Sequence, residues 1–237
     1  MAKIVAIGGG ELRQGETKVI DRFIVHLSGK AAPKMLFIPT ASYDAKGYID
    51  LVRQKFGELG CIVDTLCLIS NTYEDKEIYD KIISSDIIYV GGGDTVRMME
   101  KWRENKLDVY LVDAYNKGIV LSGLSAGSIC WFMFGHSDSD SFLNKGQWDY
   151  TRAEGLGLIP AAHCPHYNEE GRENFDKMLE RENISGIALE DNTAFIEING
   201  EYQILKSDKS RKAYLLKKHF NSIIKTELPE GKLHIKL

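Results

Sequence analysis

One segment carries a serine in a pattern suited to nucleophilic chemistry. Gly123-Leu124-Ser125-Ala126-Gly127 is a G-x-S-x-G sequence, and it directly follows the apolar run GIVLS. In such a turn between a strand and a helix, the residues two positions away must be small, or strand and helix collide. The turn lifts the hydroxyl beside the free N–H groups of the helix start, which favour developing negative charge. The alternative is a tight turn at which Ser125 merely caps the helix.

A second cluster of glycines suits the stabilisation of that charge. Gly91-Gly92-Gly93 follows another apolar run and precedes Asp94. Glycine lets a backbone approach a ligand closely. One N–H of this cluster would join that of Ala126 as an oxyanion hole, where a single donor contributes roughly 3–4 kcal/mol. A phosphate-cradling loop is the alternative, although neither this cluster nor GGGELR at residues 8–13 matches the dinucleotide or P-loop fingerprint.

A nucleophilic serine needs a base, and we assign that role to His166. The run LIPAAHCPHY holds His163 and His166, and Pro165 stiffens the backbone of the second histidine. These histidines and Cys164 lack a matching cluster of metal ligands elsewhere in the sequence, so we expect no metal and no organic cofactor.

The base in turn needs an acid that fixes its tautomer. Glu190 and Asp191 end the apolar run IALE, and Asp138 and Asp140 lie in a polar segment after the serine. We favour Glu190, because a strand end aims a side chain more accurately than a flexible loop does. Spacing alone leaves the four candidates open.

The elements that must position these residues alternate along the first half of the chain. Short apolar runs predict strands at residues 3–7, 34–38, 61–68, 87–90 and 118–122. Helical spacing or capping predicts helices at residues 16–27, 48–59, 71–83, 94–103 and 107–116. Strands that alternate with helices predict an α/β fold, a parallel sheet covered on both faces. The site then lies beyond the carboxyl ends of the strands, where the glycine clusters fall.

The second half of the chain is harder to interpret. We predict that the helix begun at Ser125 continues to about Phe134, and that Gly135–Gly157 is a long surface loop. We also predict a helix over residues 169–181 and a strand over 184–190. Asn199-Gly200 indicates a hairpin between residues 195–198 and 202–205. The tail from Arg211 is predicted as further strand and irregular chain, and no linker divides the single domain expected over residues 1–237.

Composition excludes several classes of function. The net charge is −4, which leaves no basic footprint for nucleic acid. No apolar run approaches the roughly 20 residues of a membrane span, and MAKIVAIGGG is typical of a first strand rather than of a signal peptide. The four cysteines form no disulfide framework, so we expect a cytoplasmic protein.

Four motifs in order resemble those of the serine peptidases that include peptidase E and cyanophycinase. They are VGGGDT, GLSAGS, LGLIPAAHCPHY and GIALEDNTAF, within residues 90–195. The resemblance implies a three-layer α/β/α fold with a mostly parallel central sheet, similar to class I glutamine amidotransferases and flavodoxin-like proteins. It also implies hydrolysis of short peptides or isopeptides through an acyl-enzyme. Family members form monomers or dimers, so a homodimer is compatible with the resemblance.

Residue by residue, the resemblance implies a Ser125–His166–Glu190 triad, with the acid taken from cyanophycinase. For peptidase E an aspartate near Asp140 is also implied. The oxyanion donors would be Gly92 or Gly93 together with Ala126.

The resemblance has one departure in the loop that reads the substrate. Aspartyl dipeptidases have an asparagine where this chain has Asp94, and Asp94 would repel an acidic substrate side chain. Arg97, one turn further on, would compensate or pair with it. We therefore expect a serine peptidase for short peptides. The alternatives are an esterase or amidase that uses the same site, and a non-catalytic module that binds an anion.

Overall fold

The structure is a computed structural model that describes residues 2–144, 146–220 and 222–237. Its strands are β1 Lys3–Ile7, β2 Lys34–Ile38, β3 Ile62–Thr65, β4 Ile87–Val90, β5 Val120–Leu124, β6 Phe132–Ser137, β7 Thr151–Glu154, β8 Ile159–Cys164, β9 Gly186–Leu189, β10 Thr193–Ile198, β11 Glu201–Lys206, β12 Ala213–His219, β13 Ser222–Glu227 and β14 Gly231–Leu233. Its helices are α1 Lys18–Leu27, α2 Lys46–Gly57, α3 Asp75–Ile83, α4 Thr95–Glu104, α5 Leu107–Asn116, α6 Ala126–Ile129, α7 Asp140–Leu143 and α8 Asn174–Glu180, with 3₁₀ turns η1 Leu12–Gln14 and η2 Thr40–Ser42.

The larger sheet has eight strands in the order β14-β11-β10-β1-β5-β4-β2-β3. The five neighbouring strands β1, β5, β4, β2 and β3 are parallel. Beyond β1, the strands β10, β11 and β14 extend the sheet in antiparallel pairs. Every residue of β4 and of β5 is buried. This burial on both faces explains why these strands are continuous apolar runs rather than alternating ones.

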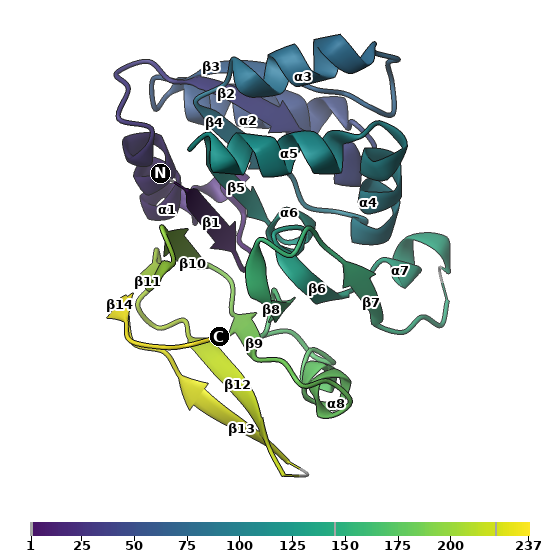
Figure 1. Ribbon diagram of the computed structural model, residues 1–237, viewed down its shortest axis with the longest axis vertical. Coiled ribbons are helices and arrows are strands. Elements are labelled where there is room, and N and C mark those ends of the chain that lie inside the picture. Colours follow the sequence, from purple (N-terminus) through teal and green to yellow (C-terminus); the bar gives the residue numbers. More distant parts are fainter. Residues whose placement is uncertain (1, 145, 221) are drawn as a thin grey trace.

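Helices cover both faces of this sheet. Ile20 and Ile24 of α1 and Phe56 of α2 belong to one buried cluster, while Met98 of α4 and Leu111 of α5 belong to another. The predicted three-layer α/β/α fold with a mostly parallel sheet is thereby confirmed (Figure 1). Within the described residues, no helix is both long enough and apolar enough to cross a membrane.

A second sheet was not foreseen. Its six strands have the order β13-β12-β9-β8-β6-β7, and its β12–β13 hairpin projects from the end of the molecule opposite α3 (Figure 1). The predicted helix from Ser125 to Phe134 is wrong beyond Ile129, because the chain becomes β6. Phe132 and Phe134 are buried while Met133 between them is 46% exposed, which is the alternation of a strand.

The predicted surface loop at Gly135–Gly157 is also only partly correct. It contributes the end of β6, the short helix α7 and strand β7, and residue 145 within it lies outside the described residues. The hairpin predicted at Asn199-Gly200 is confirmed, since β10 and β11 pair there in antiparallel register.

Candidate active site

Ser125 occupies a sharp turn between β5 and α6. Its backbone has φ 58° and ψ −115°, a combination rarely adopted by a residue with a side chain. The flanking glycines are required by space. A Cβ at Gly123 would lie 2.2 Å from the carbonyl oxygen of Gly127, and a Cβ at Gly127 would lie 2.2 Å from that of Val90. The chain therefore turns sharply at Ser125, in a conformation that is strained for a residue with a side chain.

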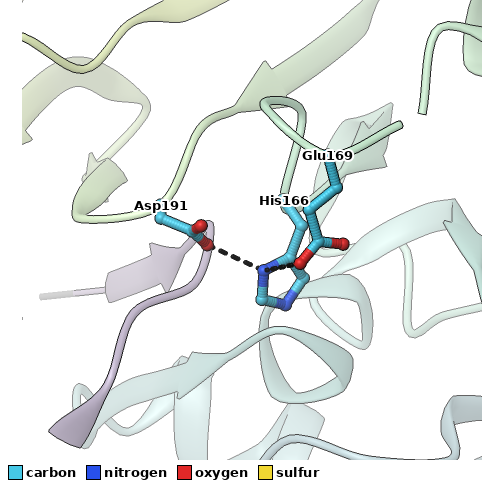
Figure 2. Close-up of side chains that lie close together, drawn as sticks. All are labelled: His166, Glu169 and Asp191. Carbon is cyan, nitrogen blue, oxygen red and sulfur yellow. Dashed lines mark hydrogen bonds and ion pairs between the residues drawn. The ribbon is translucent and has the colours of Figure 1, made fainter. Parts of the chain in front are cut away.

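His166 lies just beyond the end of β8, and a backbone hydrogen bond fixes its position. Its N–H donates to the carbonyl of Gly8 at 2.8 Å, and its φ is 51°. The ring Nδ1 lies 2.7 Å from Oδ1 of Asp191, just beyond β9 (Figure 2). A carboxylate only accepts hydrogen bonds, so this contact places the proton on Nδ1 and leaves Nε2 free as a base.

Asp191 is itself held by a neighbouring side chain. Asn168 donates from Nδ2 to Oδ2 of Asp191 at 2.8 Å and accepts the Asp191 N–H on Oδ1, also at 2.8 Å. Burial alone would raise the pKa of Asp191, but the hydrogen bonds from His166 and Asn168 outweigh it and lower the pKa below its ordinary value. Asp191 is therefore an ionised partner for His166 at neutral pH.

Glu190 is the residue that we favoured from the sequence as the partner of His166. Among the described residues, its side chain makes no hydrogen bond or ion pair with His166. Its Oε2 accepts the backbone N–H of Lys212 at 2.9 Å, at the start of the β12 region. Adjacent residues in extended chain point to opposite sides, so a shift of one position exchanges one carboxylate for the other. The carboxylate beside His166 follows the same strand, but it belongs to Asp191.

The two aspartates of the polar segment also lie elsewhere. Asp138 pairs with the buried Arg172 at 3.5 Å. Asp140 accepts hydrogen bonds from Asn144 at 2.7 Å and from the Asp149 N–H at 3.2 Å. Neither carboxylate is recorded in contact with His166 among the described residues.

The glycines after β1 have a role that sequence reasoning missed. A Cβ at Gly9 would lie 2.0 Å from Oδ1 of Asp191 and 2.4 Å from Nδ1 of His166. The carbonyl of Gly8 accepts the His166 N–H, and that of Gly9 accepts the Asn192 N–H at 2.9 Å. This loop is thus the backbone against which the His–Asp pair packs. Its only signal in the sequence was three glycines at a strand end.

Ser125 and His166 line one cavity of about 580 Å³. Asp191 lines it too, together with Gly10, Glu11, Leu12, Arg13, Glu16, Gly47, Tyr48, Leu51, Gly92, Leu124 and Glu169. No hydrogen bond joins Ser125 to His166 among the contacts of the described residues. Catalytic hydrogen bonds are often long without substrate and shorten in its complex.

The predicted oxyanion donors differ in their placement. A Cβ at Gly92 would lie 3.2 Å from Cβ of Ser125, so this residue borders the nucleophile. Ala126 begins α6, and its N–H therefore has no acceptor within the helix. Gly93 instead packs on η2, where a Cβ would lie 2.2 Å from the carbonyl oxygen of Ala41. The geometry favours Gly92 over Gly93.

The residues predicted to read the substrate, Asp94 and Arg97, line a different cavity of about 610 Å³. Asp94 is buried at the start of α4, where its Oδ1 accepts the Arg97 N–H at 3.1 Å and its Oδ2 accepts the Tyr43 hydroxyl at 3.0 Å. Arg97 pairs with Glu100 at 3.6 Å. Asp94 is thus a helix cap, and its charge does not border the Ser125 cavity.

The remaining histidines of the site region are structural. His163 is fully buried, with Nδ1 2.9 Å from the Ile187 carbonyl and Nε2 2.8 Å from the Ser128 hydroxyl. Burial lowers the pKa of His163 and of His136 to about 3, so both are neutral at physiological pH.

Three groups near the cavity have the chemistry of metal ligands. His166, Glu169 and Asp191 offer ligand atoms within 4.8 Å of one another (Figure 2). Glu169 Oε1 lies 3.7 Å from Nδ1 of His166, while its Oε2 lies 3.5 Å from the buried Arg172. The 2.7 Å contact between His166 and Asp191 is a hydrogen bond that engages Nδ1 of the ring and one oxygen of the carboxylate.

The chain is similar to known peptidases in sequence and in fold. The model of Peptidase family S51 matches residues 4–205. The Bacillus subtilis (strain 168) protein named "Uncharacterized peptidase YgaJ" is 32% identical over 97% of this chain and 98% of its own length. Peptidase E of Streptomyces coelicolor is 22% identical over 78% of this chain and 75% of its own. The crystal structure of a peptidase from an acI-B1 Actinobacterium superposes with a TM-score of 0.71, covering 96% of this chain and 97% of that one at 19% identity.

Proposed function

Since this chain belongs to peptidase family S51 and is a serine-type peptidase, we propose that it hydrolyses short peptides through a triad of Ser125, His166 and Asp191. The observation that carries the proposal is the 2.7 Å contact between His166 and Asp191, in the cavity that the strained Ser125 also lines. In the proposed mechanism Ser125 is the nucleophile, His166 the base and Asp191 the orienting acid, which are the three roles that acyl transfer requires.

The proposed reaction proceeds in two halves. The Ser125 Oγ forms a bond to the scissile carbonyl carbon, its proton passes to Nε2 of His166, and the carbonyl electron pair moves onto oxygen. The N–H groups of Gly92 and Ala126 stabilise that oxyanion. Collapse breaks the C–N bond, and His166 returns the proton to the leaving amine. Water then hydrolyses the acyl-enzyme by the same steps, while Asp191 stabilises the imidazolium each time.

The charges of the cavity favour a small zwitterionic substrate. Carboxylates of Glu11, Glu16 and Glu169 line it, and Arg13 is the one lysine or arginine among the described lining residues. The carboxylates attract the free ammonium group of a dipeptide, and Arg13 suits a carboxylate. Because Asp94 lies outside the cavity, its charge gives no reason to reject acidic substrate side chains.

The test is hydrolysis of a dipeptide panel by the wild type, Ser125→Ala and the matched control Ser84→Ala, an exposed serine at the end of α3. The panel contains Asp-Xaa, β-Asp-Arg and neutral dipeptides, each with a free and an acetylated amino terminus. We expect Ser125→Ala to lose activity, Ser84→Ala to keep it, and acetylation to slow cleavage at least about tenfold, the loss of one charged contact. Peptide hydrolysis that survives in Ser125→Ala would refute the proposal, and ester turnover without peptide turnover would favour an esterase.

A further inference from the structure

Tyr48 lies beside the proposed oxyanion hole, although it is far from Ser125 in sequence. It is the third residue of α2, and its ring packs edge-on against Phe37, with centroids 5.2 Å apart. A Cβ at Gly91 would lie 2.8 Å from Cε1 of Tyr48, so the absence of a side chain at position 91 admits the ring. The close packing fixes the ring and aims its hydroxyl toward the backbone after β4.

The hydroxyl of Tyr48 contacts the backbone group expected to bind the oxyanion. It accepts the N–H of Gly92 at 3.4 Å, a long and weak hydrogen bond. Gly92 in turn borders Ser125, and all three residues line the same cavity. The Tyr48 oxygen thus lies next to the Gly92 N–H, to which the carbonyl oxygen of the substrate would bind in the proposed mechanism.

The Tyr48 hydroxyl has a proton to donate. A phenol can donate one hydrogen bond and accept others. Among the contacts of the described residues, Tyr48 accepts from Gly92 and donates to no group. Burial raises the pKa of Tyr48 to about 12, so the group keeps its proton at any pH at which the enzyme would work.

We propose that the Tyr48 hydroxyl is a third donor to the oxyanion, beside the N–H groups of Gly92 and Ala126. The inference rests on the proposed function of Ser125. As the serine oxygen bonds to the carbonyl carbon, charge develops on the carbonyl oxygen. The Gly92 N–H then donates to that oxygen in place of the Tyr48 oxygen, and the Tyr48 O–H donates to it as well. No proton is transferred from Tyr48. The contact strengthens only as the charge forms, and therefore it lowers the barrier rather than improving substrate binding.

The test is Tyr48→Phe, which removes the donor and keeps the ring against Phe37. We expect kcat to fall about 10- to 100-fold, somewhat less than the roughly 10²–10³-fold for an essential oxyanion donor, because two N–H groups remain. KM should change less than about twofold. Affinity for a peptide aldehyde, whose adduct carries the oxyanion, should fall by the same factor as kcat, which a merely structural role would not produce.

Two controls separate the possible failures. Tyr43→Phe removes a hydroxyl that binds Asp94 in the other cavity, and it should leave kcat within about twofold of wild type. Ser125→Ala tests the proposed function itself. If Ser125→Ala is inactive but Tyr48→Phe keeps wild-type kcat, or raises KM alone, the role of Tyr48 is refuted while the triad stands. If Ser125→Ala stays active, both proposals fail.

Discussion

Replacing Gly9 by alanine tests whether the His–Asp pair is the working part of this site. The added Cβ would lie 2.0 Å from Oδ1 of Asp191 and 2.4 Å from Nδ1 of His166, far inside contact distance. The atoms in its way are the ends of two side chains that are only 19% and 20% exposed but face a cavity. These side chains can rotate away, whereas the backbone of the loop is held by Asn192. The substitution therefore separates the pair without unfolding the sheet.

The magnitude follows from what the contact supplies. In serine peptidases the loss of a correctly placed acid lowers kcat by about 10⁴-fold, because the histidine no longer holds the right tautomer. In Gly9→Ala the aspartate is displaced rather than removed, so it still orients the histidine in part. We therefore expect kcat/KM to fall by a factor between about 10² and 10⁴, or roughly 3–5 kcal/mol. The fold should lose about 1–3 kcal/mol from overpacking, in addition to the strain of a side chain at the φ of 159° that Gly9 adopts.

The assay measures kcat/KM on the best dipeptide together with thermal unfolding. The matched control is Gly57→Ala, at the end of α2, where no heavy atom lies within 4 Å of the new Cβ. We expect the control to keep its activity within about twofold, since nothing near the site moves. A folded Gly9→Ala enzyme with more than a third of wild-type activity would show that the close His166–Asp191 contact is not needed, and the reasoning would be wrong.

Further predictions concern three carboxylates. Asp191→Asn should lower kcat by about 10³- to 10⁴-fold, whereas Glu190→Gln, which keeps an oxygen for the Lys212 N–H, should stay within about threefold of wild type in the same kinetic assay; the reverse order would restore Glu190 as the acid. Asp21→Asn should stabilise the protein above neutral pH, because burial, opposed in part by the hydrogen bond from Thr17, raises the pKa of Asp21 from 3.8 to about 7. A group with a raised pKa contributes stability that is fully present below pH 4 and is lost as the pH rises through 7. In urea unfolding, Asp21→Asn should therefore be more stable than the wild type by up to about 4 kcal/mol at pH 8 and by almost nothing at pH 4. An equal gain at both pH values would contradict this origin.

The parts of the site that the sequence predicted are those encoded locally. The sharp turn at Ser125 requires small residues at fixed spacing, so the pentapeptide alone is enough to predict the turn. In the sequence, Pro165 indicates His166 as the base, because it stiffens the backbone of that histidine. The structure places His166 just beyond the end of β8. The strands β1, β2 and β4 and the helix α5 were likewise predicted at the bounds observed, since burial on both faces or one apolar stripe is visible in a short window.

Features that depend on contacts between distant segments could not be predicted from the sequence. The choice between Glu190 and Asp191 turns on which side of an extended chain faces β8, and a single-residue offset reverses it. The packing of Gly9 on the His–Asp pair and of Tyr48 beside Gly92 joins segments far apart in the sequence. The run after Ile129 is predicted as the continuation of a helix. The exposed Met133 between the buried Phe132 and Phe134 is also apolar, so the sequence does not show the alternation of a strand.

The proposed function requires Ser125 to be an activated nucleophile, and mass spectrometry after treatment with a fluorophosphonate tests this most directly. We predict a single covalent adduct on the peptide that contains Ser125, absent in Ser125→Ala and formed at least about 10²-fold more slowly in His166→Ala, because the base is gone. An adduct on another residue, or one that persists in Ser125→Ala, would contradict it.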